Sequence, residues 1–328
     1  MSASQLSLLD NIRFSNGSEG LKNYYHCLLQ NNREVSLEMI NDHKLQFVTL
    51  YLLRHELSKA NVAEAINPLY RKSLEIVAEL TGKKTAKTEK TIRSGQEDTA
   101  SALRWMIRTG YFYNDTDKDY DQLMELSSLM LTRSFRDTAV LPEIAEMIFA
   151  RQRGGKLIHE LVWAFFEARS PESLLLIARR LYSPDSSEIS LSKRLLCFVP
   201  VIRKWPDISG IALYSGVLSW LQNNRAYLYY TGESLHLSSS PIYYAVSWAA
   251  KYLCRPVSVD TGEPLIALNE LENALSSRFG ELPERLQQQL ADFSYMLYRK
   301  NIYQWNTWIR FPIDVQTSLA TQIMGGLI

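Results

Sequence analysis

The feature that most constrains the fold is a helical spacing of apolar residues, which is clearest between residues 156 and 181. Apolar side chains recur there at i, i+3, i+4 and i+7 in two successive sets, namely Ile158, Leu161, Val162 and Phe165, and then Leu174, Ile177, Ala178 and Leu181. Between the sets, Ser170 can cap a helix start, and Pro171 at the first helical position loses no hydrogen bond. The stretch therefore predicts two antiparallel helices joined by a tight turn.

The same periodicity continues along the rest of the chain and predicts an all-α fold. In the N-terminal half it predicts helices over residues 17–31, 43–59, 61–81, 97–110, 118–133 and 138–151. Pro171, Pro206 and Pro241 are 35 residues apart, which is close to the period of helical-pair repeats. We therefore expect an irregular α-solenoid of antiparallel helix pairs, similar to HEAT or armadillo arrays. A globular helical bundle would give much of the same periodicity and stays open.

Two segments interrupt the helical pattern. Residues 226–237 contain two short alternating runs around Thr231-Gly232, which indicate a short β-hairpin or, equally, a helix end followed by a loop. Residues 82–95 contain almost no apolar residues, which is typical of an exposed loop. We place a soft boundary between an N-terminal helical module over residues 1–135 and a C-terminal helical-repeat module over residues 136–328, although one continuous array is also compatible with the pattern.

Charge, cysteine content and hydropathy restrict the class of protein. The net charge of +1 argues against a protein whose main task is to coat nucleic acid or anionic lipid. Cys27, Cys197 and Cys254 are too widely spaced to form a typical zinc site, so we expect reduced thiols in the core. The chain begins without the pattern of a signal peptide, and its apolar runs are shorter than a membrane span needs. These features predict a soluble, cytoplasmic protein.

Motifs for catalysis are incomplete. His159-Glu160 begins like a zinc-protease helix, but the residue four positions after the histidine is Trp163 instead of a second histidine. The Gly154-Gly155-Lys156 run has neither the upstream glycine nor the following Ser or Thr of a phosphate loop. His236 lies near three serines without an identified carboxylate partner. We therefore predict no catalytic residue, metal ligand or cofactor, while an enzyme with a site assembled from distant residues stays a second alternative.

The most basic segment carries five cations and one anion, and its cations are Lys83, Lys84, Lys87, Lys90 and Arg93. Such a run can contact phosphates, and Arg151, Arg153, Lys156, Arg179 and Arg180 could extend the basic face. The absence of aromatic residues within the run removes base stacking as a means of recognition. We favour a solvated loop and keep anion or nucleic-acid binding as the first alternative function.

Aromatic residues are concentrated in the C-terminal part, where five of the seven tryptophans and ten of the eighteen tyrosines follow residue 200. Tyrosine and tryptophan bury large areas at low entropic cost and are enriched at interfaces. The candidate partner-binding residues are Tyr227, Tyr229, Tyr230, Tyr243, Tyr244, Tyr303, Trp305 and Trp308. Packing inside the core is the competing explanation for them. The leading hypothesis is a non-enzymatic interaction or scaffold protein that binds another protein.

Overall fold

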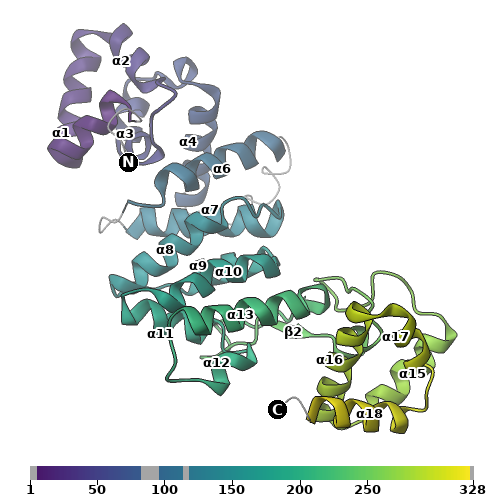
Figure 1. Ribbon diagram of the computed structural model, residues 1–328. Coiled ribbons are helices and arrows are strands. Elements are labelled where there is room, and N and C mark those ends of the chain that lie inside the picture. The colour runs from purple at the N-terminus through teal and green to yellow at the C-terminus, as the bar shows by residue number, and fades with distance from the viewer. Residues whose placement is uncertain (1–5, 83–95, 114–117, 326–328) are drawn as a thin grey trace. The chain divides into compact units, whose positions relative to one another are not determined.

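The computed structural model describes residues 6–82, 96–113 and 118–325. These residues are mostly helical, which confirms the predicted helical class (Figure 1). They divide into two compact units, residues 1–168 and residues 169–328. The boundary predicted near residue 135 falls inside the first unit, where helices on both sides of it pack together.

The first unit is built entirely from helices in its described part. These are α1 (Leu8–Asn31), α2 (Arg33–Ile40), α3 (Phe47–Lys59), the 3-10 helix η2 (Ala63–Ala65), α4 (Pro68–Thr81), α6 (Gln96–Gly110), α7 (Lys118–Ser134), α8 (Leu141–Arg153) and α9 (His159–Glu167). The predicted helix over 61–81 begins later, because Asn67 caps α4 by accepting a hydrogen bond from the amide of Leu69, with Pro68 in the first turn. Packing links α6 to α4 and α7, and α7 to α9.

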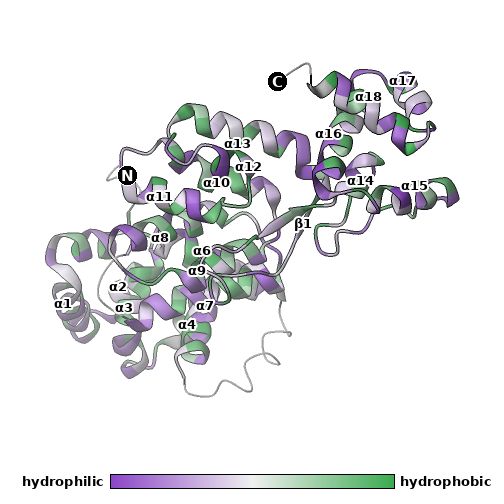
Figure 2. Ribbon diagram, turned by 90° about the horizontal axis from the view of Figure 1, so that it is seen from below, coloured by the Kyte–Doolittle hydropathy of each residue, from purple (hydrophilic) through white to green (hydrophobic). Residues whose placement is uncertain are grey.

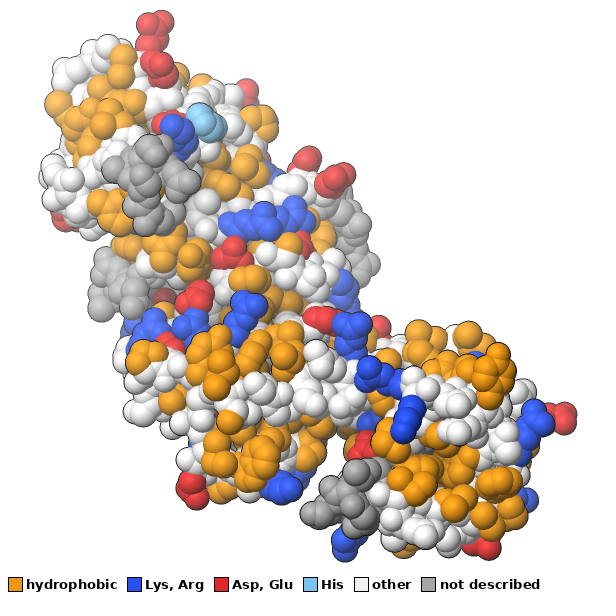
Figure 3. Space-filling model, in the orientation of Figure 1, with side chains coloured by type: hydrophobic (Ala, Val, Ile, Leu, Met, Phe, Trp, Pro, Cys, Tyr) orange, Lys and Arg blue, Asp and Glu red, His pale blue; other side chains and the backbone are white. Residues whose placement is uncertain are grey.

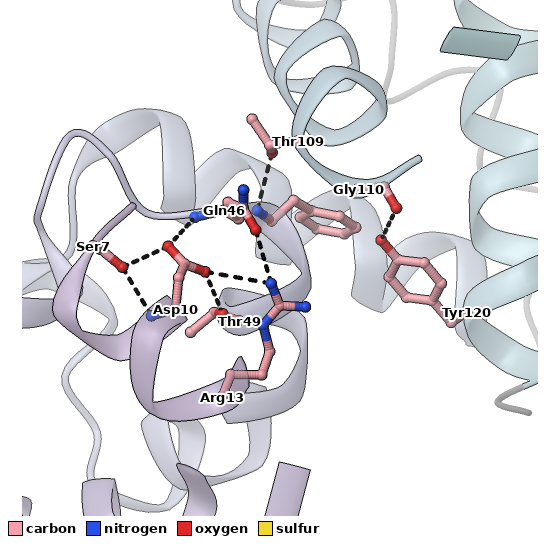
Figure 4. Close-up of polar contacts among 9 residues, drawn as sticks. Ser7, Asp10, Arg13, Gln46, Thr49, Thr109, Gly110 and Tyr120 are labelled. Carbon is pink, nitrogen blue, oxygen red and sulfur yellow. Dashed lines mark hydrogen bonds and ion pairs between the residues drawn. The ribbon is translucent and has the colours of Figure 1, made fainter. Parts of the chain in front are cut away.

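A buried polar network anchors α1 in the first unit (Figure 4). The Asp10 carboxylate is fully buried and accepts hydrogen bonds from the hydroxyls of Ser7, at 2.5 Å, and Thr49, at 2.6 Å. The carboxylate also accepts a hydrogen bond from the backbone N–H of Gln46. The Arg13 guanidinium lies 3.8 Å from the Asp10 carboxylate and donates a hydrogen bond to the side-chain oxygen of Gln46 at 2.8 Å. Because a buried carboxylate needs such partners, this network fixes α1 against the start of α3.

The second unit combines helices with one two-stranded sheet among its described residues. Its elements are η3 (Pro171–Ser173), α10 (Leu174–Ala178), η4 (Arg179–Tyr182), α11 (Ser186–Leu195), α12 (Pro200–Lys204), α13 (Ile211–Asn224), η5 (Arg225–Tyr227), β1 (Leu228–Tyr230), β2 (Tyr244–Val246), α14 (Trp248–Tyr252), α15 (Glu270–Gly280), α16 (Glu284–Lys300), α17 (Ile302–Trp308) and α18 (Ile313–Gly325). Figure 2 shows hydrophobic and hydrophilic residues side by side along these helices. That pattern is typical of helices that bury one face.

The sheet differs from the predicted hairpin in the identity of its second strand. β1 lies in the predicted segment, but it pairs antiparallel with β2, so that Leu228 faces Val246 and Tyr230 faces Tyr244. The predicted partner residues near Leu237 form a turn instead, and Leu237 is exposed. Pairing with β2 buries the large side chain of Tyr244, and this burial stabilises the observed sheet over a hairpin with the residues near Leu237.

Two other expectations are corrected. The three evenly spaced prolines do not occupy equivalent places, because Pro171 begins η3, Pro206 lies in the turn before α13, and Pro241 precedes β2 instead of a helix. Cys27 is exposed on α1, since Leu21 and Tyr25 form the buried face of that helix, whereas Cys197 and Cys254 are half-buried free thiols. Within the described ranges, every helix is too short or too polar to span a lipid bilayer.

The core of the C-terminal part of the second unit joins α14, α15, α16, α17 and α18. Tyr252 lies at its centre, stacked on Phe279 at 4.6 Å between ring centroids. On the other side of α14, the buried ammonium of Lys251 donates to the side chains of Asn224, at 2.6 Å, and Asp292. Lys251 therefore links α13, α14 and α16 through one paired charge.

Alkaline pH tests the burial of Tyr252. Burial raises the pKa of its hydroxyl to about 12, so the folded state keeps this proton between pH 10 and about 12 while the unfolded state loses it. The folded state then binds more protons, and stability falls by about 1.4 kcal/mol per pH unit as the pH rises through this window. Tyr252→Phe removes this contribution. Urea unfolding at pH 8, 10 and 11 should show the stability gap between wild type and variant narrowing above pH 10; a constant gap would contradict the assignment.

Candidate functional site

The structure separates the eight predicted partner-binding aromatic residues by exposure. Five are buried: Tyr227, Tyr230, Tyr243, Tyr244 and Trp308. For the four tyrosines, burial in the core corrects their assignment to a binding surface, whereas the buried Trp308 also lines a groove that is described below. Their burial follows from the strand pairing and from ring contacts such as that of Tyr227 with Tyr295 at 5.5 Å. Of the other three, Tyr229 and Trp305 are half-buried, and Tyr303 is 83% exposed.

The two half-buried rings have identifiable partners inside the second unit. Tyr229 packs against Gly262, where a Cβ atom would lie only 2.9 Å from the tyrosine ring. Gly262 also has a φ of +74°, so a larger residue would be strained there for both reasons. Trp305 donates its indole N–H to the Ser294 hydroxyl at 2.8 Å and meets Tyr298 edge-on at 5.2 Å. Both rings are therefore held by contacts inside the second unit.

Tyr303 and Trp308 instead meet at an apolar groove formed by α16, α17 and α18. The groove has a volume of about 460 Å³ and is lined by Phe293, Leu297, Tyr303, Gln304, Thr307, Trp308, Phe311, Leu319 and Ile323. None of these described lining residues is charged. Figure 3 shows hydrophobic side chains gathered on the part of the second unit that contains these helices. Tyr303, Phe311 and Ile323 are exposed, so the groove is open to solvent along these residues.

The floor of the groove is closely packed, because Trp308 has ring contacts on several sides. Its ring meets Phe293 edge-on at 5.3 Å and Tyr252 at 6.2 Å. The side-chain oxygen of the buried Gln316 accepts a hydrogen bond from the Tyr252 hydroxyl at 2.8 Å. Its side-chain nitrogen donates hydrogen bonds to the backbone carbonyls of Ile309 and Phe311. Gln316 thus attaches α18 to the end of α17.

One polar group at this floor lacks a hydrogen bond. The Trp308 indole nitrogen is buried, and no described residue accepts its proton. A buried donor left without an acceptor costs about 1–3 kcal/mol, so unsatisfied groups of this kind are rare in native proteins. In contrast, the neighbouring Trp305 indole is fully paired with Ser294. Of the two indoles on α17, the one at the floor of the groove is therefore the one without a hydrogen bond among the described residues.

Most residues of the groove are not among the candidates that the sequence suggests. Phe293 and Leu297 on α16, and Leu319 and Ile323 on α18, are each four residues apart, so each pair lies on one helix face. This spacing was available in the sequence. It does not reveal, however, that the two faces meet across α17, because that depends on tertiary packing.

A second cavity lies in the first unit and is charged. It has a volume of about 950 Å³ and is lined by Lys118, Asp121, Gln122, Glu125, Leu126, Leu129, Arg151, Gly155, Lys156, Leu157 and Glu160. Arg151 is buried between Asp121, at 3.3 Å, and Glu125, and Lys156 contacts Asp121 at 3.1 Å. Burial raises the pKa of Glu125, while the attraction of Arg151 opposes that rise. The charges neutralise one another and fasten α7 to α8.

The remaining predicted sites are placed as follows. His159 begins α9, and Gly155, with a φ of +65°, forms the turn between α8 and α9. Among the described residues, no group of three or more histidine, cysteine, aspartate or glutamate side chains could hold a metal ion. The basic run from Lys83 to Arg93 lies outside the described residues. Arg151 and Lys156, proposed as its partners, are paired with carboxylates, and Arg180 contacts Glu188 at 3.3 Å.

Comparison with known proteins finds no matching family model, no matching curated protein and no matching solved structure. A functional proposal for this chain therefore depends on the contacts and the exposure of its own residues.

Proposed function

We propose that this chain is a non-enzymatic interaction protein that binds another protein in the groove between α16, α17 and α18. The observation that supports the proposal is the combination of an apolar, uncharged groove with the 83% exposed ring of Tyr303 beside it. Large exposed aromatic residues next to a preformed apolar depression are typical binding hot spots. The partner would bury apolar side chains against Trp308 and Phe311 and cover Tyr303.

The proposal includes a role for the helical scaffold. We propose that the helices form an irregular solenoid of antiparallel pairs of the HEAT or armadillo kind. Packing between helices close in sequence, such as α6 with α7 and α16 with α17, supports this architecture. In such a scaffold the groove would occupy one part of a longer surface for protein segments. Nucleic-acid binding stays the alternative, although the pairing of Arg151 and Lys156 with carboxylates leaves it with less support.

A peptide selection tests the proposed function. Random 16-residue peptides displayed on phage would be selected on the full chain, and the enriched peptides synthesised and measured by fluorescence anisotropy. We expect peptides whose affinity falls about 10- to 30-fold for Tyr303→Asp, since that is the effect of losing a hot-spot residue. Leu237→Asp is the matched control, because Leu237 is equally exposed in the same unit but does not line the groove. A selection without any Tyr303-dependent peptide would overturn the proposal.

A further inference from the structure

Two cations, Lys300 and Arg310, lie close in sequence to residues that line the groove. Lys300 follows Leu297 by three residues and Phe293 by seven on α16, so it lies on the same helix face as both. Arg310 lies between Trp308 and Phe311, which both line the groove. Both cations are exposed, and neither makes an ion pair with any residue that the structure describes.

The two acidic residues closest in sequence to the groove lining are Asp314 and Asp292. Asp314 lies five residues before Leu319 on α18, which is roughly 140° around the helix axis. Asp292, adjacent to Phe293, is occupied by the buried ammonium of Lys251. We therefore expect a positive potential at the open side of the groove, even though the whole chain has a net charge of only +1.

The groove favours a helical ligand over an extended one. Its walls are helices, whose backbone groups are hydrogen-bonded internally, so the walls provide side chains but no free strand edge. An extended segment lying here would bury amide groups without partners, whereas a helix has already satisfied its own. An amphipathic helix can also place apolar residues at i, i+3, i+4 and i+7 into such a groove.

We infer that the occupant of the groove is an amphipathic helix of a partner protein, with acidic residues flanking its apolar face. This inference rests on the proposed function and specifies the partner's chemistry. The apolar side chains lie against Trp308, Phe311 and Ile323, and Tyr303 covers them from the side. The flanking carboxylates lie near Lys300 and Arg310, where they fix the direction and register of the helix.

Synthetic peptides provide the test. Two 16-residue amphipathic peptides would carry the same apolar residues at helical spacing, one with glutamates and the other with lysines on the flanks. The full chain should bind the glutamate peptide roughly fivefold or more tightly than the lysine peptide, with the difference shrinking at high salt. In the double variant Lys300→Glu/Arg310→Glu this preference should reverse, because the rim then repels the acidic flanks.

The outcomes separate this inference from the proposed function. Equal binding of the two peptides, or a preference that the double variant leaves unchanged, would overturn the acidic-partner inference. Tyr303-dependent peptides from the phage selection that carry proline, or alternating apolar residues, in their binding segment would overturn the helical form. Either result would leave docking in the groove intact. In contrast, the absence of Tyr303-dependent binding would overturn docking itself.

Discussion

Replacing Asp10 with alanine should lower the free energy of unfolding of the first unit by about 3–5 kcal/mol, the range expected when one partner of a buried charge pair is removed. The carboxylate has no exposed surface and accepts from Ser7, Gln46 and Thr49 while neutralising Arg13. Its removal leaves a buried guanidinium, whose pKa is already lowered by burial, without a counter-ion. Amide hydrogen exchange, read by mass spectrometry on the full chain, should show faster exchange across α1 and α3.

Glu19→Ala is the matched control for this experiment. Glu19 is also an acidic residue of α1 with an ion pair, in this case with Lys22 at 3.7 Å, but its side chain is 83% exposed. An exposed pair of this kind contributes about 0–1 kcal/mol. If Asp10→Ala and Glu19→Ala changed exchange equally, the Asp10 network would not anchor α1.

Trp308→Ala should destabilise the helices of the groove by about 3–5 kcal/mol, as expected for truncation of a buried tryptophan. Trp308 is 4% exposed and contacts the rings of Phe293 and Tyr252, so its loss would leave a cavity beneath the groove. Local exchange in α14, α16 and α18 should rise, while exchange in the first unit stays unchanged. Hydrogen exchange is the suitable method because it resolves the stability of separate regions in a chain with two units.

Tyr303→Ala is the control that separates stability from binding. With 83% of its surface exposed, Tyr303 contributes little to the core, so its removal should change stability by no more than about 0.5 kcal/mol. Comparable destabilisation by Trp308→Ala and Tyr303→Ala would contradict the division between a packed floor and an exposed rim.

The helices were the predictable part of the fold, because their signals are local. The Asn67-Pro68 cap and the apolar spacing in α7 and α9 can be recognised without tertiary information. The partner of β1 could not be recognised in this way. Tyr244 lies 14 residues beyond Tyr230, with which it pairs, whereas Leu237 of the predicted hairpin is only seven residues beyond Tyr230. Burial favours the more distant partner, because Tyr244 is buried and Leu237 is exposed. Pairing over such distances is decided by the core as a whole.

For the candidate site, the sequence predicted which residue types take part but not which of those residues are exposed. Aromatic enrichment identified Tyr303 and Trp308 among the candidates, but it could not distinguish an exposed ring from a buried one. In β1 the alternation that buries Tyr230 and leaves Tyr229 half-buried is a local rule, yet it applies only once the strand is known. The same enrichment therefore produced both core and rim residues. Strand pairing buries one tyrosine of β1 and one of β2, and packing against Tyr252 buries Trp308.

Photo-crosslinking from position 303 tests the docking account most directly. A photoreactive phenylalanine analogue would replace Tyr303 in the full chain, and the same analogue would replace the equally exposed Leu237 in a second preparation. Each would be irradiated with a peptide enriched in the selection. The account predicts a covalent adduct from position 303, located on the apolar face of the peptide, and none from position 237. An adduct from both positions, or from position 237 alone, would show that the peptide binds elsewhere and would contradict the groove as the docking site.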